Sequence, residues 1–261
     1  TPVNAVLVDL GGGVDRLVLS SAGPNTLTVS NVEALTGSAT ADTVTLGTPV
    51  NGALIDLAGG IDRLTLSSAA GSTLTVSNVE FIIGGTQGDV VTLGAAADGV
   101  VIDLQSGLDR LTLASTGANT LTVSNVETIT GGAMADTVTL GSAASIGTVV
   151  DLAEGLDRLV LSGAGANTLT VRNVETIAGG SAADTVTLGT AVIGGTVNLA
   201  GGNDRLVLSS AGPNTLTVSN VETLIGSAMA DTVTLGTPVN AVLVDLGGGV
   251  DRLVLSSAGP N

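Results

Sequence analysis

The chain has 261 residues, a formal net charge of −16 and 44% hydrophobic residues, and it contains no Cys, no His and no Lys. The absence of Cys excludes disulfides and thiolate metal sites, and the absence of His excludes an imidazole base or an ordinary catalytic triad. An acidic surface would repel nucleic acid and anionic membranes and attract cations. No apolar stretch is long enough and free enough of Asp to span a bilayer.

The sequence is built from tandem repeats. Residues 1–25 and 237–261 are the same string, and the dipeptide Asp-Arg recurs six times at steps of 47, 47, 48, 47 and 47 residues. A fixed period of this length is typical of a solenoid, in which each repeat contacts only its neighbours. We therefore predict a single continuous solenoid over residues 1–261, with about five and a half 47-residue repeats and both ends cut inside a repeat of a longer array.

The first repeat reads as five short strands separated by turns rich in Gly, Pro, Asn and Ser. The apolar residues alternate with polar ones, so pairs such as Leu17 and Leu19 are expected to face the core. Alternation breaks near Glu33, where we expect a bend or a bulge. The predicted strands are residues 5–10, 15–20, 26–31, 32–37 and 42–47.

The spacing of two similar segments suggests how the coils are formed. Asp15 and Asp42 both precede an apolar-x-Leu pattern, and they are 27 and 20 residues from the next copy of that pattern. This predicts one coil of three strands and one of two. The expected fold class is all-β: a parallel β-solenoid or β-roll with about two coils per 47-residue repeat.

Four segments carry a resemblance to a known family. Residues 32–47, 126–141, 174–189 and 221–236 resemble the hemolysin-type calcium-binding repeat of the RTX proteins, whose nonapeptide is G-G-x-G-x-D-x-U-x. Turns of the type before Asp136 keep the two leading glycines and lose the fourth-position glycine, whereas the Asp-Arg turns keep the fourth-position glycine and lack the first one. No turn carries the complete motif. The resemblance implies a β-roll, Ca²⁺ in the turns, and an exported protein such as a toxin, enzyme, adhesin or surface-layer protein.

The turn aspartates are the candidate metal ligands. Stacked carboxylates repel one another unless a hard cation such as Ca²⁺ neutralises them. The alternative is turn chemistry, in which each carboxylate accepts hydrogen bonds from nearby backbone N–H groups and the following Arg neutralises half of the row. Both interpretations stay open from the sequence. The candidates are Asp15, Asp42, Asp62, Asp89, Asp109, Asp136, Asp157, Asp184, Asp204, Asp231 and Asp251.

Other polar rows repeat with the same period. The row from Asp9 to Asp245 includes Asn198, which argues against an essential charge, and the row from Glu33 to Glu222 is expected to be solvated or paired with Arg. The Asn residues before Val-Glu suggest a stacked Asn ladder at a corner. The outward Thr-x-Thr pairs resemble the ice-binding faces of some β-solenoid antifreeze proteins, although Thr is also a common exposed strand residue.

These observations favour a structural protein. We expect part of an extracellular filament, adhesin stalk or surface layer, with calcium as a stabilising ion in the turns and self-association end to end or side by side as the partner interaction. The alternative is a binding module, either a calcium-dependent adhesin spacer or an ice-binding solenoid. An enzyme is not expected, because no His or Lys could activate the abundant Ser and Thr hydroxyls.

Overall fold

The computed structural model describes residues 1–237 and 242–255, and the chain forms two compact units, Thr1–Thr130 and Gly131–Asn261. Every regular element in these ranges is a β-strand, and all pairings between neighbouring strands within each unit are parallel. In the part of the chain that the structure describes, there is no helix that could cross a membrane. Each unit is therefore a parallel β-solenoid.

The first unit has two sheets, which we call odd and even after the numbering of their strands. The odd sheet consists of β1 (Asn4–Asp9), β3 (Thr26–Ser30), β5 (Thr43–Leu46), β7 (Arg63–Thr65), β9 (Phe81–Ile83), β11 (Asp98–Asp103) and β13 (Thr120–Ser124). The even sheet consists of β2 (Arg16–Val18), β4 (Ala34–Ser38), β6 (Asn51–Ala58), β8 (Thr73–Ser77), β10 (Val90–Leu93), β12 (Arg110–Thr112) and β14 (Thr128–Thr130).

In the second unit the odd-numbered strands again belong to one sheet and the even-numbered strands to the other. Its odd strands are β15 (Thr137–Leu140), β17 (Arg158–Val160), β19 (Thr176–Ala178), β21 (Ile193–Asn198), β23 (Thr215–Ser219), β25 (Thr232–Leu235) and β27 (Arg252–Val254). Its even strands are β16 (Thr148–Asp151), β18 (Thr168–Arg172), β20 (Thr185–Leu188), β22 (Arg205–Val207), β24 (Thr223–Ser227) and β26 (Leu243–Gly247).

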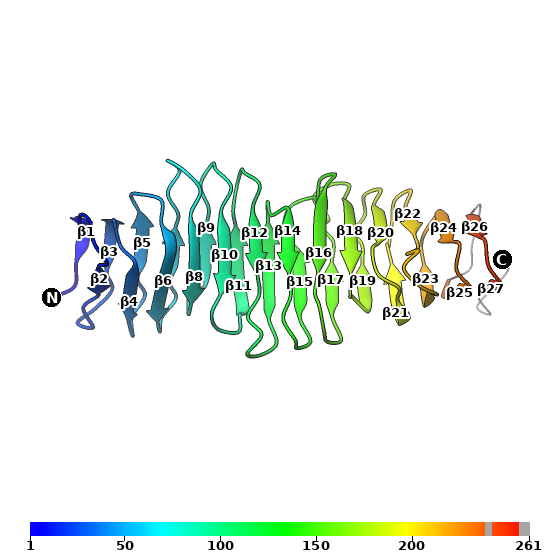
Figure 1. Cartoon of the computed structure of the whole chain (residues 1–261), viewed down its shortest axis with the longest axis horizontal. Helices are drawn as coiled ribbons and strands as arrows, with labels where there is room; N and C mark the ends of the chain where they lie inside the picture. The colour runs from blue at the N-terminus through cyan, green and yellow to red at the C-terminus, as the bar shows by residue number, and fades with distance from the viewer. Residues whose placement is uncertain (238–241, 256–261) are drawn as a thin grey trace. The chain divides into compact units, whose positions relative to one another are not determined.

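Each coil contains one strand from each sheet, and the chain crosses from one sheet to the other at every corner. Figure 1 shows the strands of each unit stacked in this order. Residues that pair in neighbouring coils are 17 to 22 residues apart, as in Val29 with Leu46 and Asn4 with Thr26. The predicted fold class, an all-β parallel β-solenoid with short coils, is confirmed.

The predicted division of the repeat into a three-strand and a two-strand coil is wrong. Every coil has two strands, and the first 47 residues contain five strands, β1 to β5. One sequence repeat therefore spans two and a half coils. The two segments that suggested unequal coils, before β2 and β5, belong to different sheets, so their spacing does not measure a coil.

The odd number of strands has a consequence for symmetry. The strands β1, β6 and β11 are equivalent in sequence, but β1 and β11 lie in the odd sheet and β6 lies in the even sheet. Successive 47-residue repeats thus present the same side chains on opposite faces of the solenoid. Within a unit, a side chain returns to the same face only after two repeats, which is five coils.

The core is a thin aliphatic layer between the two sheets. The largest fully buried side chains are Leu and Ile, including Leu35, Ile55, Leu64, Ile102 and Leu159. The predicted inward pairs are confirmed, since alternate residues of the strands are buried as the alternation requires. The buried hydrophobic residues among the described ones are all Val, Leu, Ile and Ala.

The break in alternation near Glu33 is a corner. The chain leaves β3, turns at Asn31 to Glu33, and enters β4 in the other sheet. Asn31 has a positive φ of 55°, a left-handed conformation that Asn tolerates better than most residues. The β-bulges lie elsewhere, as between Asn4 and Val6 and between Asp98 and Val100.

Candidate functional site: the carboxylate ladders

A row of polar side chains turns inward at the entrance to the strands. In the odd sheet of the first unit, the residues immediately before β3, β5, β7 and β9 are Asn25, Asp42, Asp62 and Glu80. Asn25 N donates to Asp42 Oδ1 at 2.9 Å, Asp42 N donates to Asp62 Oδ1 at 2.6 Å, and Asp62 N donates to Glu80 Oε2 at 2.7 Å. Each side chain therefore binds the backbone of the preceding coil, and we call such a row a carboxylate ladder.

The same ladder recurs at the other strand entrances. In the even sheet of the first unit, Ser72 N, Asp89 N and Asp109 N donate to Asp89, Asp109 and Glu127 in turn, at 2.7, 2.6 and 2.8 Å. The second unit contains equivalent rungs, and their acceptors are Asp157, Glu175, Asp184, Asp204, Glu222, Asp231 and Asp251.

The first Asp of a ladder can use both of its carboxylate oxygens. Asp89 Oδ1 accepts from Ser72 N, and its Oδ2 accepts from Gly85 N at 3.0 Å. Asp42 does the same with Asn25 N and Ser38 N, and it is fully buried. A buried carboxylate that accepts several N–H bonds is held in one orientation and ties two segments of backbone together.

The second Asp of each ladder has one unsatisfied oxygen. Asp62, Asp109, Asp157 and Asp204 are at most 1% exposed, and the Oδ2 atom of each has no hydrogen-bond partner. Burial raises the pKa of these four carboxyls to about 6, and the backbone N–H bond opposes that rise. The neighbouring ladder carboxylates, such as Asp42 and Glu80 around Asp62, push the pKa further upward. These groups therefore take up protons well above the usual range of Asp.

A second row of acids lies outside the core, at the exit of the long strands. Asn31 Nδ2 donates to Asp9 Oδ1 at 2.6 Å, and Gly11 N donates to the same atom at 3.0 Å. The Asn31 bond lowers the pKa of the exposed Asp9 carboxyl. Asn198 accepts the equivalent two bonds from Asn220 and Ala200, so an amide oxygen fulfils the same role. The structure supports the prediction that charge is not essential at this position.

The predicted Asn ladder does not form. Asn31 and Asn78 are equivalent in sequence but lie at corners that leave different sheets, two and a half coils apart. Each instead binds the acid of the preceding coil, Asp9 for Asn31 and Asp56 for Asn78. The expectation for the Glu row also changes, because Glu33, like the other glutamates of the ladders, accepts a bond from a backbone N–H, in its case that of Asp15 at 2.8 Å.

The ladders hold most of the negative charge of the chain. All eleven predicted aspartates and the five glutamates of the Glu row belong to them, and these 16 side chains are buried or half-buried. The seven arginines are all exposed. Seven acidic side chains lie outside the ladders: Asp9, Asp56, Asp98, Asp103, Asp151, Glu154 and Asp245.

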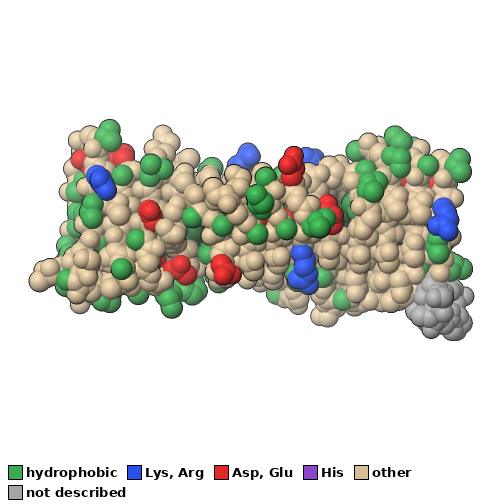
Figure 2. Space-filling model, turned by 90° about the horizontal axis from the view of Figure 1, so that it is seen from below, with side chains coloured by type: hydrophobic (Ala, Val, Ile, Leu, Met, Phe, Trp, Pro, Cys, Tyr) green, Lys and Arg blue, Asp and Glu red, His purple; other side chains and the backbone are tan. Residues whose placement is uncertain are grey.

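Nine of the aspartates are fully buried, so the outer surface is less acidic than the composition alone suggests. Red atoms are correspondingly sparse on the face drawn in Figure 2, which is mostly uncharged. The Arg of each Asp-Arg pair points outward while its Asp points inward, as alternation along the strand requires. The arginines therefore belong to the surface and not to the row of buried carboxylates.

The described residues do not fit a calcium site of the kind that the resemblance implies. Ca²⁺ requires six to eight oxygen ligands around one point. The ladder carboxylates face backbone N–H donors, and among residues 1–237 and 242–255 no group of three or more acidic side chains is placed to hold a metal ion. Calcium binding by the turn aspartates stays a prediction, to be decided by measurement.

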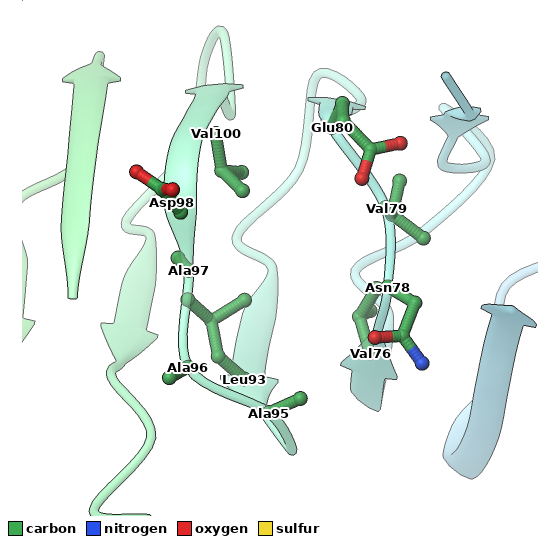
Figure 3. A pocket seen from close by; sticks show the side chains of 10 residues that line it. All are labelled: Val76, Asn78, Val79, Glu80, Leu93, Ala95, Ala96, Ala97, Asp98 and Val100. Carbon is green, nitrogen blue, oxygen red and sulfur yellow. The ribbon is translucent and has the colours of Figure 1, made fainter. Parts of the chain in front are cut away.

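A pocket of about 180 Å³ lies in the first unit, between the β8–β9 corner and the loop that leads from β10 to β11. Its wall includes Glu80, Asp98 and the small side chain of Ala96, which replaces the Pro found at positions 2 and 49. Figure 3 shows the carboxylates of Glu80 and Asp98 pointing apart from each other. This arrangement does not bring two carboxylates together for acid–base chemistry.

Four buried asparagines complete the ladders, and the sequence-based prediction did not include them. Asn25, Asn119, Asn167 and Asn214 precede the Thr-Leu-Thr-Val strands, and each is fully buried. Asn25 Nδ2 donates to Asp42 Oδ1 at 2.7 Å and to Ser20 O at 2.9 Å, while its Oδ1 accepts from Val3 N. The signal in the sequence is a polar residue immediately before each strand. Neighbouring members of one ladder, such as Asn25, Asp42 and Asp62, are 17 and 20 residues apart. A comparison of positions 47 residues apart therefore does not place them together.

No protein-family model matches this chain, and no curated protein matches it in sequence. The RTX resemblance is therefore unsupported at the level of the family. The coarser statement holds: the chain is a parallel β-solenoid with periodic Asn and Asp ladders.

Proposed function

We propose that this protein is a structural β-solenoid, an extracellular spacer that forms part of a filament, adhesin stalk or surface layer. The observation that carries the proposal is the carboxylate ladder, which joins each coil to the next by buried hydrogen bonds in addition to the sheets. Buried side-chain bonds of this kind resist local opening, since an unsatisfied buried N–H is costly. The absence of Cys agrees with this role but does not establish the location.

The test is mechanical. The chain, tethered at both ends, is stretched by atomic force microscopy beside a variant in which Asp42, Asp89, Asp136, Asp184 and Asp231 are replaced by Ala. We expect the wild type to unfold in regular steps of whole coils, and the variant to unfold at a clearly lower force. Unfolding at equal forces would contradict a mechanical role for the ladders, and circular dichroism checks that the variant is folded before stretching.

Calcium binding remains the second candidate, favoured by the unpartnered Oδ2 atoms of the second ladder aspartates. Calorimetric titration of the chelator-treated protein with CaCl₂ tests it, with MgCl₂ as the control. Heat of binding, together with loss of β-structure on chelation, would establish a calcium-dependent spacer. No binding heat and no change on chelation would dismiss calcium as a stabilising ion.

Ice binding receives less support from the arrangement of Thr. The pairs Thr26/Thr28 and Thr43/Thr45 lie side by side on β3 and β5, but Arg63 and Phe81 follow on the next strands of the same sheet. The complete Thr-x-Thr pair therefore extends over only two neighbouring strands there, although Thr65 continues one of its two columns. Measurement of thermal hysteresis decides the matter, and a value indistinguishable from buffer would remove this alternative.

A further inference from the structure

Five of the six corners that lead into an Asp-Arg strand carry a large apolar residue at their tip. Val14, Ile61, Leu108, Leu156 and Val250 are between 69% and 91% exposed. The position is set by the backbone: the preceding glycine has a positive φ, and at Gly60 a Cβ would lie 2.7 Å from the backbone of the neighbouring coil. Because the next Asp turns inward into the ladder, the residue between them must point outward.

Two opposite charges flank this apolar tip. In the corner between β11 and β12, Asp103 ends one strand on the outer face of the odd sheet and Arg110 starts the next on the outer face of the even sheet. The same order of acid, apolar tip and Arg occurs at Asp9, Val14 and Arg16. Single exposed apolar residues are ordinary on protein surfaces. Here, however, an exposed apolar residue recurs between an acid and an Arg at five of the six equivalent corners. The fold does not explain this recurrence, because it requires only an outward side chain there.

The sixth corner shows that the fold does not need the apolar tip. There the acid is replaced by Asn198 and the tip by Asn203, which is exposed, while Asp204 keeps its place in the ladder. The corner is thus complete without the acid or the apolar residue. Both departures from the pattern occur in the same repeat, as expected if the two features serve one purpose.

We propose that the corners of Val14 and Leu108, which both lead from the odd to the even sheet, form a lateral contact between two parallel copies of this solenoid, in register, with the apolar tips meeting at the centre and each acid facing the partner's Arg. Two observations indicate that the partner at this surface is a second copy of the chain: the arrangement of charges and the spacing of the tips. Each corner has its acid on one side and its Arg on the other, so a second copy related by a two-fold axis along the solenoid places opposite charges together. An antiparallel copy would place like charges together.

The period favours the same partner. In the first unit Val14 and Leu108 lie on corners of the same type, five coils apart, or about 24 Å at the usual strand spacing. In the second unit Leu156 and Val250 are also five coils apart, at corners that lead from the even to the odd sheet. A second copy has tips at the same intervals, so contacts that are weak singly add along the length. This inference rests on the proposed structural role and names the surface through which copies associate.

Sedimentation velocity over a range of concentrations tests the contact. In the first variant, Val14, Ile61, Leu108, Leu156 and Val250 are replaced by Asn, the residue that position 203 already has. In the second, Asp9, Asp56, Asp103, Asp151 and Asp245 are replaced by Asn, as at position 198, which retains the corner hydrogen bond. We expect the apolar variant to weaken association by about tenfold or more, and the acid variant to weaken it and to remove its dependence on salt.

A single cysteine reports the register, because the chain has none of its own. Leu108→Cys should give covalent dimers under mild oxidation, whereas Thr75→Cys, on the outer face of β8, should not. A wild-type chain that is monomeric at all concentrations, variants that associate as the wild type does, or dimers without the Leu108→Cys link would overturn the proposal. A monomeric chain that still unfolds in regular coil steps under force would leave the structural role standing.

Discussion

Two aspartates in the same loop show how differently one side chain can be used. Asp103 and Asp109 flank the turn between β11 and β12, and both accept hydrogen bonds from backbone N–H groups. Asp103 is at the surface and binds Asn125, whereas Asp109 is 1% exposed with an unsatisfied oxygen and a pKa of about 6. Asp109 is buried and its carboxylate accepts one hydrogen bond, whereas the carboxylate of Asp103 accepts two at the surface. We therefore expect substitutions in the inner row, the ladder carboxylates, to change the stability of the fold. Substitutions in the outer row, from Asp9 to Asp245, should mainly change the charge of the surface.

The largest effect is expected from breaking the inner row at a member that uses both of its carboxylate oxygens. Asp89→Ala leaves the buried N–H groups of Ser72 and Gly85 without acceptors, so the free energy of unfolding should fall by about 3 kcal/mol. Chemical denaturation followed by circular dichroism measures it. A loss below about 0.5 kcal/mol would show that the ladder bonds contribute little.

The pH dependence of stability should follow the second ladder aspartates. The folded pKa of Asp62, Asp109, Asp157 and Asp204 is about 6, above the ordinary value of 3.8, so the folded state binds more protons than the unfolded state between these values. Stability should therefore rise as the pH falls from 7 to 4. We expect the thermal midpoint to increase by roughly 5 °C over this range.

The control for the pH experiment is a variant with Asn at all four of these positions. Because it lacks the titrating carboxyls, its thermal midpoint should change much less between pH 7 and pH 4. An equal rise in this variant, or a fall in the wild type, would assign the pH dependence to other groups.

A smaller gain is expected from repairing an incomplete rung. Ser72 stands where the other four ladders have Asn, and its Oγ is buried without a partner. In Ser72→Asn the amide should bond to Ser67 O and accept from Val50 N, as Asn119 does with Ala114 O and Ala97 N. We expect an increase of about 1 kcal/mol in unfolding free energy. Ser72→Ala should be nearly neutral, and a destabilised Ser72→Asn protein would contradict the ladder geometry.

The smallest effect belongs to the outer row. Asp103→Asn should change the unfolding free energy by less than about 0.5 kcal/mol, because Asn198 already makes the equivalent bonds. The same denaturation measurement applies, with Asp89→Ala as the reference. A loss as large as that of Asp89→Ala would remove the distinction between the two rows.

The fold class, the strands and their inward residues could be predicted from the sequence because alternation and turn residues are local signals. The number of strands in each coil and their pairing could not be predicted in this way. Asp15 and Asp62 look like neighbours in one column, yet the structure puts Glu33 beside Asp15, and Asp42 and Glu80 beside Asp62. Whether a coil contains two or three strands depends on pairing between residues about 20 positions apart, and the local sequence pattern does not determine that pairing.

The five strands in each repeat also constrain how such a chain can change its length. Inserting or deleting a single 47-residue repeat would move every side chain that follows it to the other side of the body, so that an acid, tip or arginine that had faced one neighbour would face the opposite one. Two repeats gained or lost together would leave the sidedness intact. Only the gain or loss of two repeats at once preserves a contact made on one side of the solenoid. Related chains that use such a contact would therefore be expected to differ in length by an even number of repeats.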